Sequence, residues 1–345
     1  MRNFQIPEIV SHISGPILRG RVKALAARIG ALLWVGIVVV GCPGARAEIG
    51  PGQNITIYVG FAAGGASDIV ARLLGSRLGE RLGGANVIIE NRPGASGEIA
   101  ARIVAGSEPN GMSILATTTA LAVSETLSKS KGFTAKDLRA VSLAASTPDS
   151  LVINSENPAK TLNEFLAQAK GKDISFGSAG VGTSTYVAAA YFFKEIAKAD
   201  AIHVPFPGGA PALNSLMGGH IDAVAITLPT IVPFVRAGKL RGIAIASAER
   251  LKDLPDLPTY RESGYTDFLS STWVGFFVSS KTKDGDAEKI NVAFNEVLKE
   301  PGIEKRLQEI GFQPNPASLK DANEKFHSEV ETWRDRIKAI GMEPQ

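Results

Sequence analysis

The chain has 345 residues, of which 44% are hydrophobic and 21% charged, a composition typical of a folded globular protein of about two domains. This composition excludes a wholly disordered chain and a fibrous repeat, and the single cysteine excludes an internal disulfide and a zinc site of thiolates. Residues 1–47 carry a formal charge of +5 against +3 for the whole chain, so the rest is mildly acidic and no nucleic-acid partner is expected.

Residues 1–47 show the pattern of a secretory signal peptide. Basic residues precede an uncharged stretch over residues 29–45, and an Ala-Arg-Ala tripeptide ending at Ala47 supplies the small residues that signal peptidase reads. The stretch contains a proline and is shorter than the ~20 residues that a membrane-spanning helix needs, which disfavours a membrane anchor. We therefore predict export through the Sec pathway and cleavage after Ala47. In a second reading, a loose lipobox makes Cys42 a lipid anchor.

Strand and helix signals alternate in the first part of the remaining chain. Runs rich in β-branched residues predict strands over residues 55–59, 87–89 and 113–117. Between them, apolar residues at helical spacing predict a helix that Ser67 or Asp68 caps and a second helix over residues 98–105. This order predicts parallel strands joined by right-handed crossovers, in a sheet that helices cover on both faces, and hence an α/β fold.

The alternation continues further along the chain. Strands are expected over residues 141–143, 151–153, 174–176, 201–204, 223–226, 243–246 and 273–278. Thr161 and Glu164 form a capping box that opens a helix. Thr147-Pro148 lies between two of the strands, and we expect the chain to cross between lobes there. The helical tail over residues 286–340 is too long to belong only to the second unit, so we expect it to return to the first.

The predicted architecture therefore has two lobes, two chain crossings and a cleft between the lobes. Residues 48–147 form the first part of lobe 1, residues 148–272 form lobe 2, and residues 273–345 return to lobe 1. In open α/β sheets, ligands bind outside the carboxyl ends of the strands. The loops that follow strands are therefore the candidate ligand-binding segments.

Three such loops share one design, in which a strand is followed by small residues and then by the start of a helix. They cover residues 61–68, 177–184 and 205–211. Glycine lets the backbone approach a ligand closely, and the first N–H groups of a helix are unpaired donors at the positive end of its dipole. Such helix starts bind carboxylate, phosphate or sulfate without a cationic side chain. A single loop of this kind is more often plain architecture, but three in one chain favour an anion site facing a cleft.

The sequence offers few residues for catalysis. Beyond residue 47 the histidines are His203, His220 and His327, and no two of them have the spacing of a metal site. Neither a Gly-x-Ser-x-Gly nucleophile elbow nor a phosphate-binding glycine motif is present. We therefore expect a binding protein that is not an enzyme and that uses no metal and no cofactor.

Four segments, in this order, resemble motifs of the solute-binding proteins of tripartite tricarboxylate transporters, the Bug-type receptors. They are residues 55–72 (ITIYVGFAAGGASDIVAR), 90–97 (ENRPGASG), 176–182 (FGSAGVG) and 203–222 (HVPFPGGAPALNSLMGGHID). The resemblance extends over nearly all of residues 48–345. It implies a periplasmic, two-lobed binding protein of the type II fold, expected as a monomer. It also implies capture of a small organic carboxylate and delivery to a permease with one large and one small membrane subunit. We expect the ligand to be a di- or tricarboxylate or an aromatic acid.

The resemblance also implies roles for the three loops. The first loop holds one carboxylate through backbone N–H groups and ordered water, and the other two close from the second lobe and help to select the ligand. The predicted ligand-binding residues are Phe61, Ala62, Ala63, Gly64, Gly65, Ser67, Asp68, Thr118, Ser178, Gly180, Gly182, Thr183, Ser184, Pro205, Phe206, Gly209 and Ala210. Asp68 is expected to cap the helix or to orient water rather than to face an anion.

This sequence departs from the family pattern in the selectivity loops, at Tyr186, Phe206-Pro207 and Asn214. Phe206 and Tyr186 are compatible with an apolar or aromatic acid, or with simple packing. Two rival functions fit the same residues. One is a sensor that presents a carboxylate to a membrane signalling partner, and the other is a secreted enzyme of the same fold.

Overall fold

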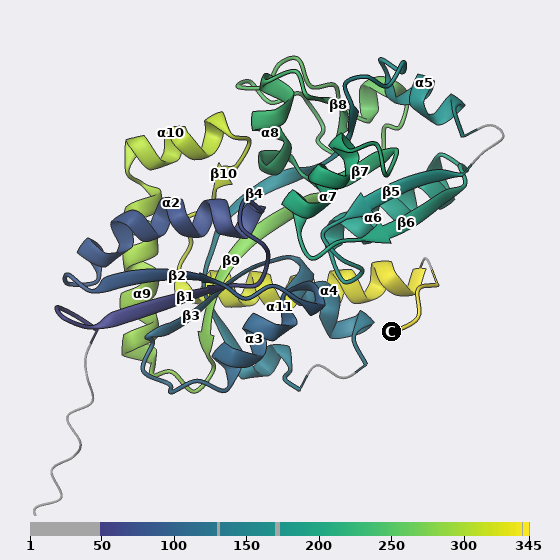
Figure 1. Ribbon diagram of the computed structural model, residues 1–345. Coiled ribbons are helices and arrows are strands. Elements are labelled where there is room, and N and C mark those ends of the chain that lie inside the picture. The colour runs from purple at the N-terminus through teal and green to yellow at the C-terminus, as the bar shows by residue number, and fades with distance from the viewer. Residues whose placement is uncertain (1–48, 130–131, 170–172, 340, 345) are drawn as a thin grey trace, which may run out of the picture. The chain divides into compact units, whose positions relative to one another are not determined.

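The computed structural model describes residues 49–129, 132–169, 173–339 and 341–344. The predicted signal peptide, with Ala47 and Cys42, lies outside the described residues. In the described part of the chain, ten strands form one sheet on which helices pack (Figure 1). This arrangement confirms the α/β class predicted from the sequence.

The strands are β1 (Asn54–Val59), β2 (Asn86–Asn91), β3 (Ser113–Thr118), β4 (Leu138–Asn154), β5 (Ile174–Ser178), β6 (Ala201–Pro205), β7 (Ala223–Thr227), β8 (Leu240–Ile245), β9 (Ser271–Ser279) and β10 (Gln313–Pro314). The α-helices are α2 (Ala66–Arg81), α3 (Glu98–Ala105), α4 (Ala120–Leu127), α5 (Leu162–Ala167), α6 (Ser184–Tyr191), α7 (Gly209–Met217), α8 (Leu228–Arg236), α9 (Asp284–Leu298), α10 (Pro301–Glu309) and α11 (Leu319–Ala339).

The sheet has two halves that share strand β4. In the first half-sheet, β1 lies between β2 and β3 and runs parallel to both, while β9 pairs antiparallel with β3 and with the first part of β4. In the second half-sheet, β5 runs parallel to β6 and β7, and the last part of β4 pairs antiparallel with β7 and β8. The predicted crossovers between parallel strands are therefore present in each half.

Strand β4 corrects one expectation. The sequence predicts two separate strands on either side of Thr147-Pro148, but residues 138–154 form a single strand. Proline has no N–H to give here, and the next N–H along the strand, that of Asp149, donates to the carbonyl of Ser270, just before β9, at 3.1 Å. The strand changes partners at this point: Pro148 still pairs with Ser271 on β9, and Asp149 pairs with Thr227 on β7. The lobe boundaries at residues 147 and 272 stay a prediction.

Alternating side chains of β9 show how the first half-sheet is covered on both faces. Val274 and Phe276 lie in one apolar cluster with residues of α2 and α9, and Trp273 and Phe277 lie in another with residues of α3, α4 and α11. This period of two is what a strand buried on both faces requires.

The C-terminal tail consists of helices α9, α10 and α11, and it packs on the first half-sheet. The Phe294 ring of α9 lies 4.3 Å from the Phe276 ring, and the Phe326 ring of α11 lies 4.8 Å from the Phe277 ring, measured between centroids. The capping box at Thr161 is also present, because its hydroxyl accepts a hydrogen bond from Glu164 N–H at 3.2 Å.

Candidate functional site

The starts of four helices meet around one small cavity of about 30 Å³, which we call the helix-start cavity. Helices α2, α6, α7 and α8 each contribute residues from their first turn or their cap, and Thr118 joins them from the end of β3. The cavity has room for roughly one or two water molecules. None of the described residues that line it is charged.

The cavity contains part of the predicted site. The predicted residues that line it are Phe61, Gly65, Ser67, Thr118, Thr183, Ser184 and Gly209. Seven further lining residues were not predicted: Ala66, Ala179, Thr185, Ile226, Thr227, Thr230 and Thr272. The predicted residues that do not line it are Ala62, Ala63, Gly64, Asp68, Ser178, Gly180, Gly182, Pro205, Phe206 and Ala210.

The missed residues of the β7–α8 turn show which sequence signal was available. Strand β7 passes directly into α8 at Thr227, with no glycine between them, and Pro229 occupies the first turn of the helix. Threonine at the N-cap with proline in the first turn is a recognised helix-start signal. The start of α8 could therefore be predicted from the sequence although no glycine-rich loop precedes it. Thr272 has no such signal, because it comes from the start of β9.

Helix α2 begins at Ala66, with Gly65 as its N-cap, so Ser67 and Asp68 lie in the first turn rather than at the cap. The Ser67 side chain is fully buried, and its hydroxyl lacks a hydrogen-bond partner although it lies at the cavity wall. A buried polar group without a partner is costly unless something binds it. Together with the free N–H groups of the first turn, this hydroxyl makes the start of α2 a site for a hydrogen-bond acceptor.

Asp68 organises the loop in front of α2. Its buried carboxylate accepts hydrogen bonds from Gly64 N–H, from Arg72 Nε and from Asn91 Nδ2, each at 2.9 Å. Asn91 also donates to the Phe61 carbonyl at 3.0 Å, which ties the loop to β2. Burial raises the pKa of Asp68, but these hydrogen bonds outweigh it and hold the pKa below its usual value. Asp68 is therefore bonded within the loop and does not line the cavity.

The second loop is fixed by its own hydroxyl groups. Thr183 is the N-cap of α6: its hydroxyl accepts from Tyr186 N–H at 3.2 Å and donates to the Gly180 carbonyl at 2.7 Å. The hydroxyl oxygen of Ser178, at the end of β5, lies 2.7 Å from Nε2 of His203. Burial lowers the pKa of His203 to about 4, so the ring is neutral near pH 7. His203 is therefore a neutral, hydrogen-bonded ring with a structural role behind the second loop.

The two aromatic residues of the selectivity loops lie in different places. The Tyr186 ring stacks on the His203 ring with 4.0 Å between centroids, and it does not line the helix-start cavity. Phe206 lines a neighbouring cavity of about 250 Å³, which we call the loop cavity, together with Phe61 and Gly180. Of the two, only Phe206 is placed beside a cavity at the loops.

Loops from the two half-sheets touch directly. Gly182 N–H of the second loop donates to the Ser96 hydroxyl at 3.1 Å, and Ser96 follows β2 in the first half-sheet. Gly208 of the third loop has φ = +144°, and a Cβ atom there would lie 3.1 Å from Ala62 of the first loop. The first, second and third loops therefore face one another across the region that holds both cavities.

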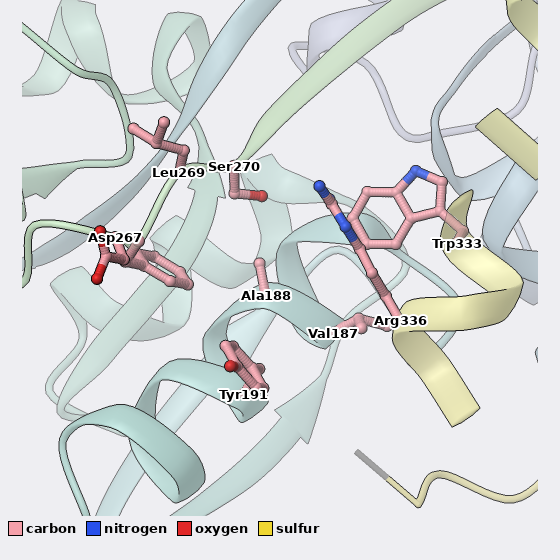
Figure 2. A pocket seen from close by; sticks show the side chains of 9 residues that line it. Val187, Ala188, Tyr191, Asp267, Leu269, Ser270, Trp333 and Arg336 are labelled. Carbon is pink, nitrogen blue, oxygen red and sulfur yellow. The ribbon is translucent and has the colours of Figure 1, made fainter. Parts of the chain in front are cut away.

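A third pocket, of about 260 Å³, lies between α6 and α11 and is lined by no residue of the predicted loops. Figure 2 shows Val187, Ala188 and Tyr191 reaching it from α6, and Trp333 and Arg336 from α11. The Arg336 guanidinium lies over the Trp333 ring, 5.1 Å from its centroid. This pocket is larger and includes Asp267 and Arg336 in its lining, but no helix start opens into it. We therefore place the candidate site at the helix-start cavity.

Two kinds of feature are absent from the residues that the structure describes. No helix among them is both long and apolar enough to span a membrane. Nor do three or more of their His, Cys, Asp and Glu side chains gather in a way that would hold a metal ion.

Comparison with known proteins finds a matching family and a relative of similar length. The family described as "Tripartite tricarboxylate transporter family receptor" (TctC) matches residues 70–342. Protein BugT of Bordetella pertussis (strain Tohama I) is 27% identical over 321 residues, which cover 91% of this chain and 98% of BugT.

Two solved structures from Rhodopseudomonas palustris are similar in fold and carry ligands. MatC (Rpa3494) with bound malate has a TM-score of 0.77 and 29% identity, and the match covers 83% of this chain and 99% of MatC. Rpa4515 with adipate has a TM-score of 0.81 and 26% identity, covering 86% of this chain and 99% of Rpa4515. The predicted binding-protein fold and the predicted family are both confirmed. This chain belongs to the TctC receptors of tripartite tricarboxylate transporters, a family of solute-binding receptors and not of enzymes.

Proposed function

We propose that this protein is a periplasmic receptor that captures a small organic carboxylate between its three loops and delivers it to a permease of the tripartite tricarboxylate type. The observation that carries the proposal is the convergence of four helix starts on one uncharged cavity, with the unpartnered Ser67 hydroxyl at its wall. Each helix start favours an anion by about 0.3–1 kcal/mol, and the sum needs no lysine or arginine.

The ligand class follows from the chemistry of these donors. Backbone N–H groups and hydroxyls bind carboxylate oxygens well, and each charge-assisted hydrogen bond contributes about 1.5–3 kcal/mol. A few of them supply the roughly −8 kcal/mol that micromolar binding requires. The similar structures with malate and adipate both carry dicarboxylic acids, which supports an acid with a carboxylate at each end.

The proposal includes a hinge. The chain passes between the half-sheets at Pro148-Asp149 in β4 and again just before β9, so we infer that residues 48–147 and 273–345 form one lobe and residues 148–272 the other. Because the helix-start cavity holds only about 30 Å³, a dicarboxylic acid must enter while the lobes are apart. Closure around it then gives the form that the permease recognises.

Binding is tested by thermal unfolding and calorimetry against a panel of mono-, di- and tricarboxylic acids, aromatic acids included. We expect at least one acid to raise the melting temperature and to bind with micromolar affinity. Ser67→Ala should weaken that binding about tenfold, because it removes a donor inside the cavity. Ser76→Ala is the matched control, since Ser76 lies exposed on the same helix. If no acid binds the purified protein, the proposal is wrong.

Export is tested separately. We propose that the signal peptide is removed after Ala47, so the intact mass of protein recovered from the periplasm should correspond to a chain that starts at Glu48. A mass that starts at Cys42 and includes acyl chains would instead favour the lipid anchor.

A further inference from the structure

A buried carboxyl group lies where the chain passes between the half-sheets. Asp149 follows Pro148 in β4, and its side chain is buried against the start of β9. The Ser270 hydroxyl donates to Oδ2 at 2.5 Å, and the Thr272 hydroxyl donates to Oδ1 at 2.7 Å. Figure 2 shows Ser270 at the edge of the pocket that Arg336 also lines. One carboxyl group thus fixes the hydroxyls of two residues on the second crossing.

Ionisation decides the direction of these bonds. Burial raises the pKa of Asp149 to about 6, while its two hydroxyl partners and the charge of Arg336 act in the opposite direction. At pH 7.5 the group is therefore mostly ionised, and a carboxylate can only accept hydrogen bonds. The Thr272 hydroxyl therefore donates its only proton to the Asp149 carboxylate.

The bond from Thr272 to Asp149 also determines the hydrogen bonding of a residue that lines the helix-start cavity. Ser184, at the start of α6, has its hydroxyl oxygen 2.9 Å from the Thr272 hydroxyl oxygen. Since Thr272 has given its proton to Asp149, Ser184 must be the donor in this pair. Ser184 lines the cavity, so the side chain offers the ligand lone pairs and no free proton.

A second pair of hydroxyls, those of Thr183 and Thr185 in the same turn, likewise has as its donor a residue that lines the cavity. The Thr183 hydroxyl donates to the Gly180 carbonyl, so the neighbouring Thr185 hydroxyl, 3.1 Å away, must donate to Thr183. Thr185 also lines the cavity. At the start of α2 the Ser67 hydroxyl, which also lines the cavity, has no partner and keeps its proton. The Ser184 and Thr185 hydroxyls at α6 can therefore only accept a hydrogen bond from a ligand, whereas the Ser67 hydroxyl at α2 can donate one.

We propose that the ligand is a hydroxycarboxylic acid, whose hydroxyl group donates a hydrogen bond to Ser184. This inference rests on the proposed function, because it assumes that an acid binds in the helix-start cavity. A carboxylate takes the donors at α2, and a hydroxyl on a nearby carbon finds an acceptor in Ser184. A keto group at the same carbon is an acceptor, so it gains no hydrogen bond from the Ser184 hydroxyl. The relay from Asp149 through Thr272 to Ser184 thus sets which substituent the receptor tolerates.

The experiment compares acids that differ only in this substituent. Dissociation constants are measured by calorimetry at pH 7.5 for succinate and malate, and for glutarate, 2-hydroxyglutarate and 2-oxoglutarate. We expect the hydroxy acid to bind about three- to tenfold more tightly than the unsubstituted acid, the range of one neutral hydrogen bond. The keto acid should bind more weakly than either.

Two variants test the relay itself. Ser184→Ala removes the acceptor, so the preference for the hydroxy acid over the unsubstituted acid should fall to about one. Thr272→Val leaves Ser184 with a free proton, so binding of the keto acid should improve relative to the hydroxy acid. Thr126→Val is the control: it removes a buried, unpartnered hydroxyl that does not line the cavity, and it should leave all ratios unchanged. If Thr272→Val fails to fold, the Ser184→Ala ratios still decide the question.

The outcomes separate this inference from the proposed function. If hydroxy, unsubstituted and keto acids bind the native protein equally well, the inference is overturned and the carboxylate receptor stands. A preference for the hydroxy acid that survives in Ser184→Ala also overturns it, because the donor's partner then lies elsewhere. If none of the acids in the broad panel binds, the proposed function itself fails.

Discussion

A Cβ atom on Gly208 would lie 3.1 Å from both the backbone nitrogen and the Cβ atom of Ala62. Gly208 precedes α7 in the second half-sheet, and Ala62 belongs to the loop before α2 in the first. Only glycine fits this contact, because φ = +144° is also a conformation that L side chains rarely adopt. The close approach of the two loops therefore depends on the absence of a side chain at one position.

Gly208→Ala should weaken ligand binding by tenfold or more, because the added methyl group keeps the two loops apart. The strained backbone adds a loss of about 1–3 kcal/mol in the free energy of unfolding. Calorimetry with whichever acid binds the native protein measures the first effect, and denaturant unfolding the second. Gly219→Ala is the control: φ is +70° there, but a Cβ atom would meet nothing within 4 Å. If both variants lose affinity equally, the loop contact has no special role.

Asp68→Asn should loosen the loop before α2. The substitution removes the charge that Arg72 and Asn91 bond to, and we expect the free energy of unfolding to fall by about 1–3 kcal/mol. Affinity for the ligand should fall as well, because the loop that leads into Ser67 loses its support. Asp321→Asn, at an exposed carboxylate that bonds Ser318, is the comparison and should change neither quantity appreciably. Unchanged affinity in Asp68→Asn would show that the loop holds its shape without this carboxylate.

The pKa of Asp149 predicts a pH dependence of stability. Burial raises the pKa to about 6 in the folded protein, against 3.8 for the free side chain, so the folded state holds the proton more tightly. The stabilisation is complete below about pH 4 and is lost as the pH rises through 6, by roughly 3 kcal/mol in total. Asp149→Asn should therefore remove a fall in stability between pH 4 and 6. Urea unfolding of both proteins at several pH values measures the difference.

The titration of His203 should change the free energy of unfolding in the opposite direction, over a pH range that overlaps that of Asp149. Burial lowers the pKa of the ring to about 4, from 6.5, so the unfolded chain takes up a proton first as the pH falls. The contribution of His203 is complete above about pH 6.5 and is lost as the pH falls towards 4. His203→Gln should reduce the loss of stability in acid. The same urea titrations would contradict this assignment if the variant and the native protein lost stability in parallel.

Much of the fold follows from local sequence patterns. The β-branched runs, the helical spacing after residue 67 and the capping box at Thr161 each specify the conformation of a short segment, and such preferences need no distant partner. The small residues of the three loops likewise indicate helix starts, and parts of all three loops line the cavity. The motifs, finally, were sufficient to identify the receptor family.

Tertiary structure decided the rest, because it brings together residues that the sequence keeps apart. The bond between Ser184 and Thr272 joins positions 88 residues apart, and that between Thr272 and Asp149 joins positions 123 residues apart. Which hydroxyl donates and which accepts along these bonds depends on which of them contacts the carboxylate. Residue spacing in the sequence does not specify that contact. Sequence by itself therefore indicated the receptor family and the helix starts that line the cavity. The partner of the Ser184 hydroxyl was decided by packing between the start of α6 and the start of β9.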